Sequence, residues 1–327
     1  MAASDKIIAL VRAGTLGDKV QFKRVVESLI AEEKQKGHHV LAKKLEQELL
    51  KLNTSNSVLN SPINKDNNIS SLVDEISPKL KFSNLILPAY VENTLNELIE
   101  EQSRVELLRS YSLEPRHKIL LIGPPGNGKT SLAEAIAESM MVPLIVVRYE
   151  GIIGSYLGET ASRLKKIIDY ASTRRCVLFF DEFETLGKER GDTHETGEIK
   201  RVVSSLLMQI DSLPSHVIVI AATNHSELLD RAVWRRFQLR LEIPQPTRAQ
   251  IQKWFECFEE KNNLKLGYAY ETLAKKLYGS NFAEIEEFGW GILRKYVLSQ
   301  PNSNIKNIIS QSLKNWSEIS CIAQHKE

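Results

Sequence analysis

The chain has 327 residues, of which 42% are hydrophobic and 26% are charged, and its formal net charge is +2. These are ordinary values for a folded globular protein, and the near balance of charge gives no sign of a general preference for nucleic acid, a membrane surface or an acidic partner. No apolar run approaches the ~20 residues that a membrane-spanning helix needs. The cysteines Cys176, Cys257 and Cys321 lie far apart without metal-ligand spacing, so we expect reduced thiols in a cytoplasmic protein.

Residues 1–52 repeat apolar side chains at helical spacing, and we expect a small bundle of short helices. The segment is predicted to be a docking domain for a substrate or adaptor, and a plain helical cap is the alternative. A flexible linker is predicted over residues 53–75, because eleven of the nineteen residues 53–71 are Asn or Ser.

Short apolar runs alternate with helical segments in residues 76–245. The runs expected as strands are 118–122, 144–148, 176–181, 216–223 and 239–243. This alternation predicts an α/β fold with a parallel sheet wrapped by helices. From residue 246 to residue 327 the pattern becomes wholly helical.

A glycine-rich loop joins the first of these runs to a helical segment and has the form G-x-x-x-x-G-K-[ST]. Its backbone N–H groups and the following helix dipole suit phosphate groups. Lys129 is expected to reach the β- and γ-phosphates, and Thr130 to offer its hydroxyl to Mg²⁺. The residues predicted to bind the nucleotide here are Gly123, Pro124, Pro125, Gly126, Asn127, Gly128, Lys129, Thr130 and Ser131.

Two acids, Asp181 and Glu182, end the run that starts at Cys176. Ligands of open α/β sheets bind at the carboxyl ends of the strands. Asp181 is therefore expected to hold Mg²⁺ through water and also to contact the nucleotide. Glu182 is expected to polarise the water molecule that attacks the γ-phosphate.

Polar residues also follow the next strand. Asn224 comes directly after the apolar run that ends at Thr223 and is expected to orient the attacking water. Arg235 and Arg236 stand between apolar residues at the end of a short helical segment. An arginine pair can neutralise charge on the γ-phosphate of a neighbouring subunit, which predicts an oligomer with shared sites. A surface salt-bridge pair is the alternative.

With these motifs in order, the chain resembles the AAA family of AAA+ ATPases over about residues 80–299. Residues 123–130 look like the Walker A loop, 178–182 like Walker B, and Asn224 like the first sensor. Arg235-Arg236-Phe237 is similar to the paired arginines of the microtubule-severing and ESCRT-disassembling branch. The resemblance implies a P-loop NTPase sheet with helices on both faces, a small helical lid, ATP with Mg²⁺, and a homo-oligomeric ring, commonly a hexamer.

Residues 152–159 resemble the first pore loop of that family, in which Tyr156 and Leu157 would contact a polypeptide substrate in the central channel. Residues 187–197, with His194, are a candidate second pore loop. The chain departs from the family where Ser155 replaces a common Lys. It also departs at residues 279–285 of the lid, and it has no lid arginine as second sensor.

Two functions remain open at this point. One is a motor that remodels, unfolds or threads a polypeptide. The other is an ATP-gated regulatory partner of a separate effector such as a serine protease, docked through residues 1–52. The chain looks most like small bacterial AAA proteins. Some of these are similar to ATPases that accompany a separate subtilisin-like serine protease. A nucleic-acid motor is disfavoured by the neutral charge.

Overall fold

The computed structural model describes residues 69–152, 157–186, 196–300 and 304–324, all of which belong to one unit of the chain, Asn67–Glu327. The predicted docking segment 1–52 and most of the predicted linker lie outside these residues. No helix in the described ranges is both long and apolar enough to cross a membrane.

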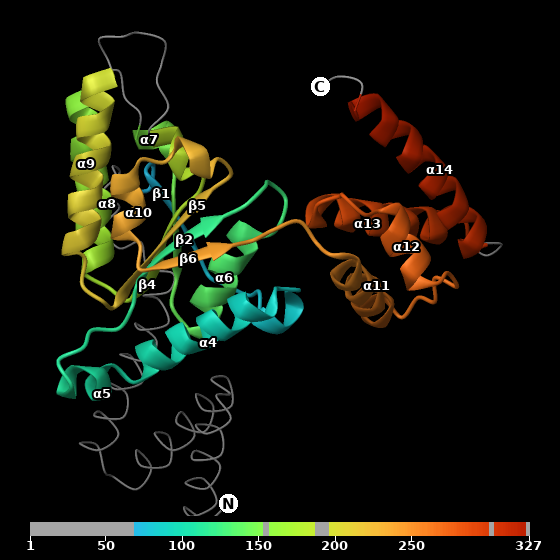
Figure 1. Cartoon of the computed structure of the whole chain (residues 1–327), viewed down its shortest axis with the longest axis horizontal. Helices are drawn as coiled ribbons and strands as arrows, with labels where there is room; N and C mark the ends of the chain where they lie inside the picture. Colours follow the sequence, from blue (N-terminus) through green and yellow to red (C-terminus); the bar gives the residue numbers. More distant parts are fainter. Residues whose placement is uncertain (1–68, 153–156, 187–195, 301–303, 325–327) are drawn as a thin grey trace, which may run out of the picture. The chain divides into compact units, whose positions relative to one another are not determined.

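A six-stranded sheet forms the centre of the described α/β part (Figure 1). Its strands are β1 (Val73–Ile76), β2 (Lys118–Ile122), β3 (Leu144–Val147), β4 (Cys176–Phe180), β5 (Val217–Thr223) and β6 (Leu239–Glu242). Their order is β1-β3-β4-β5-β2-β6, and every neighbouring pair is parallel except β1 with β3. The predicted α/β class with a largely parallel sheet is confirmed.

Strand β1 is the part of the sheet that the sequence pattern did not reveal. It begins at Val73, inside the segment 53–75 that was assigned to a linker, so the end of that segment is strand. Val73 lies opposite Val147 and Ile76 opposite Leu144 in the antiparallel register. Its four residues, Val-Asp-Glu-Ile, lack the alternation of apolar and polar residues by which a half-buried strand is recognised.

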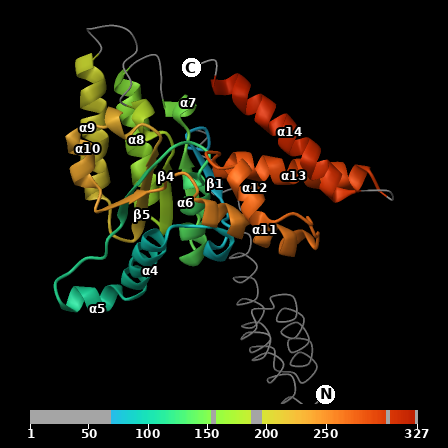
Figure 2. The same cartoon turned by 45° about the vertical axis from the view of Figure 1, so that its right-hand side comes forward.

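Helices cover both faces of the sheet, as Figures 1 and 2 show. One face carries α4 (Ala89–Ser103) and α6 (Lys129–Ser139), and the other carries α8 (Leu157–Ser172), α9 (Thr196–Ser212) and α10 (Arg231–Arg236). Side chains of a strand point alternately to its two faces. Accordingly, Leu120 of β2 packs in the core cluster under α8 and α9, whereas Ile119 and Leu121 pack under α4 and α6. Both faces of the central strands are therefore buried.

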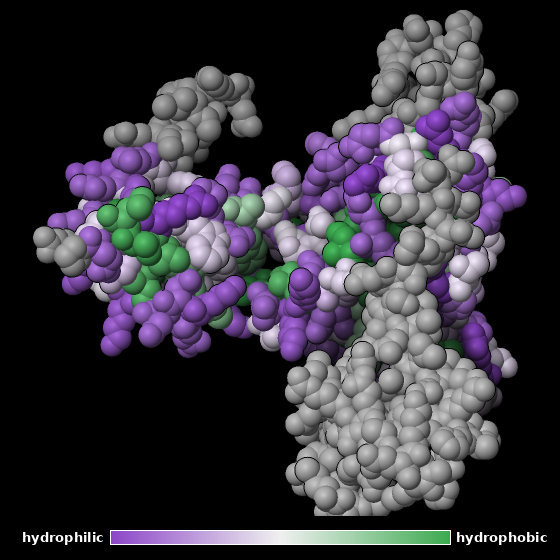
Figure 3. Space-filling model, turned by 180° about the vertical axis from the view of Figure 1, so that it is seen from behind, coloured by the Kyte–Doolittle hydropathy of each residue, from purple (hydrophilic) through white to green (hydrophobic). Residues whose placement is uncertain are grey.

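The described residues after β6 form helices only. They are α11 (Arg248–Asn262), α12 (Tyr270–Lys276), α13 (Phe282–Leu298) and α14 (Ile305–Gln324). These helices have a core of their own, which includes Phe255, Leu273 and Ile285. Figure 3 shows hydrophobic side chains on the surface of this helical part. Val297 and Leu298, in the last turn of α13, are among its exposed apolar residues.

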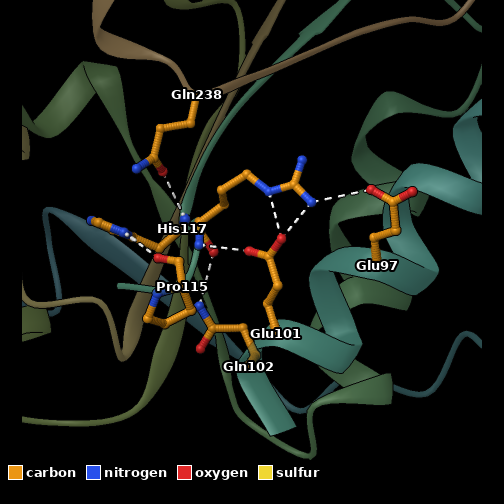
Figure 4. A network of polar contacts seen from close by, with 7 residues as sticks. Glu97, Glu101, Gln102, Pro115, His117 and Gln238 are labelled. Atoms are coloured by element: carbon orange, nitrogen blue, oxygen red, sulfur yellow. Dashed lines mark hydrogen bonds and ion pairs between the residues drawn. The ribbon is translucent and has the colours of Figure 1, made fainter. Parts of the chain in front are cut away.

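A polar network fixes the start of β2 (Figure 4). Arg116 precedes the strand, and its backbone N–H and side chain both donate to Glu101 of α4, at 2.9 and 2.7 Å. The Arg116 guanidinium also donates to Glu97 (3.2 Å), and the carbonyl of Arg116 accepts from the amide of Gln102 (2.9 Å). From the other side, Gln238 accepts the backbone N–H groups of the next two residues. The network sets the direction in which β2 runs toward the glycine-rich loop.

Candidate nucleotide site

The loop between β2 and α6 depends on glycine for its path. Gly128 is the N-cap of α6 and has φ +83°, in the left-handed region that favours glycine. Gly123 lies so close to the end of β6 that a Cβ would sit 2.1 Å from the backbone oxygen of Ile243. The loop leads directly into the first turn of α6, whose unpaired N–H groups and positive dipole end attract anions.

Lys129 folds back over this loop and is only 6% exposed. Its Nζ donates to the carbonyl oxygen of Gly123 (2.7 Å), that of Pro124 (3.0 Å) and Oδ1 of Asn224 (2.6 Å). These contacts use all three donors of the ammonium group. Burial lowers the pKa of Lys129, while Asp181 and Glu184 act in the opposite direction. An entering phosphate would therefore meet a largely desolvated ammonium that is already held at the loop.

The predicted acids lie beside the loop, at the carboxyl end of β4. The hydroxyl of Thr130 donates to Oδ2 of Asp181 at 2.9 Å, which joins the first turn of α6 to β4. Oδ1 of Asp181 accepts the backbone N–H of Glu182 at 3.0 Å. Glu182 is exposed and has φ +45°, a backbone conformation that costs energy for a non-glycine residue. The local geometry thus presents the Glu182 side chain to solvent beside the loop.

Glu184 is a buried member of this site that the sequence analysis missed. It is 3% exposed, and its Oε1 accepts the backbone N–H of Asn224 at 3.3 Å. Because Asn224 also accepts from Lys129, Glu184 is linked through it to the glycine-rich loop. Its spacing of two residues after the Asp181-Glu182 pair is the signal that could have identified it.

The residues of the site fit a nucleoside triphosphate with a divalent cation. The loop and helix offer N–H donors, and Lys129 supplies a positive charge. Since the Thr130 hydroxyl gives its hydrogen to Asp181, its oxygen lone pairs stay available to a cation. Oxygen ligands of this kind suit Mg²⁺, which binds through few protein ligands together with phosphate and water.

The C-terminal helices also contact the glycine-rich loop. The N–H of Ala283 donates to the carbonyl of Gly126 (2.9 Å), and that of Phe282 donates to Oδ1 of Asn127 (3.3 Å). Asn281 caps α13 immediately before these residues. The segment in which the sequence departs from the family pattern therefore still lies against the loop, through its backbone.

The two arginines lie near the amino end of β2, whereas the glycine-rich loop follows its carboxyl end. Arg236 forms an ion pair with Asp211 of α9, and Asp211 also pairs with Lys118 at 2.9 Å. Lys118 is the first residue of β2, whereas the glycine-rich loop follows its last residue. The side chain of Arg235 is exposed and has no ion pair or hydrogen bond with any described residue.

The remaining predicted residues are placed only in part. Pro125 is exposed in the loop and Ser131 lies in the first turn of α6. Tyr156 and His194 fall outside the described residues, and Leu157 is described only as the first residue of α8. The predicted substrate contacts of Tyr156 and Leu157 thus stay predictions.

Comparison with known proteins agrees with this geometry. Residues 119–245 match the profile of the ATPase family associated with various cellular activities (AAA). The chain is 35% identical over 274 residues to an uncharacterized AAA family ATPase, y4kL, of Sinorhizobium fredii, covering 83% of this chain and 82% of that protein. It is 32% identical over 215 residues to a cell division cycle protein 48 homolog of Archaeoglobus fulgidus, covering 64% of this chain and 29% of that protein.

A third relative is a 26S proteasome regulatory subunit 8 homolog of Encephalitozoon cuniculi, 29% identical over 225 residues, which are 65% of this chain and 57% of that protein. The chain therefore spans 82% of its relative in Sinorhizobium fredii but a smaller part of the other two. The family profile coincides with the glycine-rich loop, the acids and Asn224. The chain belongs to the AAA family of ATPases, and its activity is the hydrolysis of ATP.

Proposed function

We propose that this ATPase acts as a homo-oligomeric ring, a hexamer as is common in the family, in which each subunit completes the active site of its neighbour and ATP hydrolysis remodels a polypeptide. One observation carries this proposal. The arginine pair lies near the amino end of β2, whereas the glycine-rich loop of the same chain follows the carboxyl end of that strand.

Arg236 cannot reach the nucleotide of its own subunit from where it lies. Its ion-pair partner Asp211 also holds Lys118, at the start of β2. The five residues of β2 span about 16 Å at ~3.3 Å per residue, and the loop follows them. An arginine side chain is much shorter than this, which supports a role of the pair at a nucleotide bound by another copy. Arg235, which has no described partner, is free to do so.

Mixing two inactive variants tests the shared site. Lys129→Ala disables the loop but keeps both arginines, and the double variant Arg235→Ala/Arg236→Ala keeps the loop but lacks the arginines. Each should be nearly inactive alone. Random mixing in equal amounts places an intact pair opposite an intact loop at about a quarter of the interfaces, so ATPase activity should return. Co-assembly without any return of activity would contradict the proposal.

Within the site, we assign Thr130 and Asp181 to Mg²⁺, Asp181 through water, and the loop residues 123–131 to the phosphates of ATP. Glu182 polarises the attacking water and Asn224 orients it. The hydrogen bond between Thr130 and Asp181 and the exposed position of Glu182 support these roles. Omitting Mg²⁺ should abolish hydrolysis, and Thr130→Val should raise the Mg²⁺ concentration needed for half-maximal activity.

The polypeptide substrate is supported by the resemblance of residues 152–159 to a pore loop and by the relatives. One relative is named as a homolog of a regulatory subunit of the 26S proteasome. We propose that Tyr156 and Leu157 grip the substrate. Tyr156→Ala should keep ATPase activity while it abolishes unfolding of a tagged fluorescent substrate.

An ATP-gated partner of a separate effector, such as a serine protease, is the second candidate. It is favoured by the predicted docking segment 1–52 on its Asn- and Ser-rich linker. The Glu182→Gln variant, loaded with ATP in its native extract, should retain bound proteins for mass spectrometry. Recovery of a protease at fixed ratio that survives Tyr156→Ala and is lost on deletion of residues 1–52 would support the partner. Recovery of varied proteins that depends on Tyr156 would support the motor.

A further inference from the structure

Several buried polar atoms of the described residues have no hydrogen-bond partner: Nδ2 of Asn127 lies in the glycine-rich loop itself, and two more lie beside the nucleotide site. One is the hydroxyl oxygen of Tyr149, the first residue of α7 (Tyr149–Ile152), and the other is Oε2 of Glu184. Buried polar groups are almost always paired, directly or through an ordered water molecule. Two unpaired groups of complementary type in one region therefore indicate a contact that forms under working conditions.

The two groups occupy the same edge of the sheet. Tyr149 follows β3 and Glu184 follows β4, and these strands are parallel neighbours, so their carboxyl ends lie together. Burial is the main reason why the pKa of the Tyr149 hydroxyl lies well above its ordinary value, and the charges of Asp181, Glu184 and Glu182 raise it further. The phenol is thus a neutral hydrogen-bond donor that lies near three carboxylates.

The ring of Tyr149 packs against the core cluster beneath α8 and α9. A phenylalanine would fill that space without burying a hydroxyl. Packing therefore accounts for the aromatic ring but not for its oxygen atom, which needs a polar partner to offset its lost hydration.

Glu184 is the carboxylate through which the hydroxyl of Tyr149 could influence the nucleotide. Its other oxygen, Oε1, accepts the N–H of Asn224 (3.3 Å), and the side chain of Asn224 accepts from Lys129 (2.6 Å). A chain of polar contacts thus runs from Glu184 to the glycine-rich loop. Fixing Oε2 would fix the orientation of the whole carboxylate.

We propose that Tyr149 is a positioning residue for ATP hydrolysis. Its hydroxyl donates to Oε2 of Glu184, directly or through one water molecule, and so holds Asn224 and Lys129 in register with the γ-phosphate. The inference rests on the nucleotide site proposed above. It assigns no covalent step to Tyr149.

The test is Tyr149→Phe in the full-length chain, with Tyr170→Phe as matched control. The hydroxyl of Tyr170 also donates to a glutamate, Glu75 (2.9 Å). However, Tyr170 lies on α8 and Glu75 on β1, outside the nucleotide site. Tyr149→Phe should lower kcat about tenfold and leave KM for ATP and the melting temperature nearly unchanged, because small misplacements of catalytic groups cost rate. Tyr170→Phe should leave kcat at the wild-type value.

Two further measurements show whether Tyr149 acts through Glu184. Glu184→Gln removes the acceptor, so the effects of Tyr149→Phe and Glu184→Gln on kcat should be less than additive. With a non-hydrolysable ATP analogue bound, the backbone N–H of Asn224 should exchange hydrogen faster in Tyr149→Phe than in wild type.

A wild-type kcat in Tyr149→Phe, or full additivity with Glu184→Gln, would overturn the role of Tyr149 and leave the nucleotide site intact. Failure of Lys129→Ala and Glu182→Gln to affect hydrolysis would instead overturn the site itself.

Discussion

The Nζ of Lys129 lies 2.6 Å from Oδ1 of Asn224, a residue that follows β5 rather than the glycine-rich loop. The contact couples the group that would bind the β- and γ-phosphates to the group proposed to orient water. An entering phosphate would compete with Asn224 for the same ammonium hydrogens. Binding of ATP would therefore release or share the Asn224 amide at the moment when it is needed near the γ-phosphate.

The first prediction concerns Asn224→Ala. Lys129 would keep its two loop carbonyls, so ATP should still bind with an affinity within a few-fold of wild type. The attacking water would lose a polar contact, and kcat should fall about 10²-fold, the usual cost of removing one preorganised group of this kind. Steady-state kinetics together with equilibrium binding of a fluorescent ATP analogue would measure both. A rise in the dissociation constant that accounts for the whole loss of kcat/KM would contradict the role.

The second prediction concerns Glu182→Gln. The side chain is exposed and its volume barely changes, so folding and ATP binding should persist. The amide cannot accept a proton from water, and turnover should fall by about 10² or more. Phosphate release in a single turnover measures the chemical step. Asp74→Asn is a suitable control, because Asp74 lies on β1 and pairs with Arg148. Hydrolysis at the wild-type rate would exclude Glu182 as the activating carboxylate.

The third prediction compares two glycines of α13. A Cβ at Gly289 would meet the ring of Trp254 at 2.5 Å, whereas a Cβ at Gly291 would meet nothing within 4 Å. Gly289→Ala should therefore destabilise the protein by about 1–3 kcal/mol through overpacking. Gly291→Ala should stabilise it by about 0.5–1 kcal/mol, because alanine loses less conformational freedom in a helix. Urea unfolding would measure both. Equal effects of the two substitutions would show that the packing around Trp254 is not tight.

The fourth prediction concerns pH. Burial lowers the pKa of His117 from its ordinary value of 6.5, against smaller opposing effects that include its hydrogen bond with Pro115. The native state thus binds fewer protons than the unfolded state. The contribution of neutral His117 to stability is fully present above pH 6.5 and is lost as the pH falls below that value toward the lowered native pKa.

His117→Gln should make the free energy of unfolding less dependent on pH below about 6.5, because the unfolded chain would no longer carry a histidine that binds a proton while the native one stays neutral. The same substitution at exposed His225 serves as control. Urea unfolding at a series of pH values would measure both variants. An unchanged slope in His117→Gln would show that other groups dominate this pH range.

Much of the fold follows from local patterns in the sequence. The runs that become β2, β4 and β5 are short and almost wholly apolar. They are apolar because these strands are buried on both faces. The glycine-rich loop could be recognised because a tight phosphate cradle restricts residue types at several neighbouring positions. Strand β1 escaped recognition because its pairing with β3 is a tertiary interaction and its own four residues carry little pattern.

The site could be predicted only where a single short motif defines it. Glu184, after β4, contacts Asn224, after β5, and only its position two residues after the Asp181-Glu182 pair marks it in the sequence. Tyr149 has no distinctive sequence neighbourhood. The contact of Ala283 with Gly126 is made by backbone atoms, so residue type gives no indication of it. The ion pair of Arg236 with Asp211, which fixes the end of β2 near which the arginines lie, likewise joins segments far apart in the sequence.

The glycine-rich loop is shaped by residues that are synthesised long after it. The backbone oxygen of Ile243 lies so close to Gly123 that it leaves no room for a side chain there. Ala283, more than 150 residues after the loop, donates its backbone N–H to Gly126. A chain emerging from the ribosome would possess the motif early but would lack the surfaces that hold it in place. Affinity for ATP should then appear late in synthesis, once β6 and α13 have emerged. Nucleotide would consequently bind to finished subunits and spare nascent ones, which keeps incomplete chains from being stabilised by the ligand.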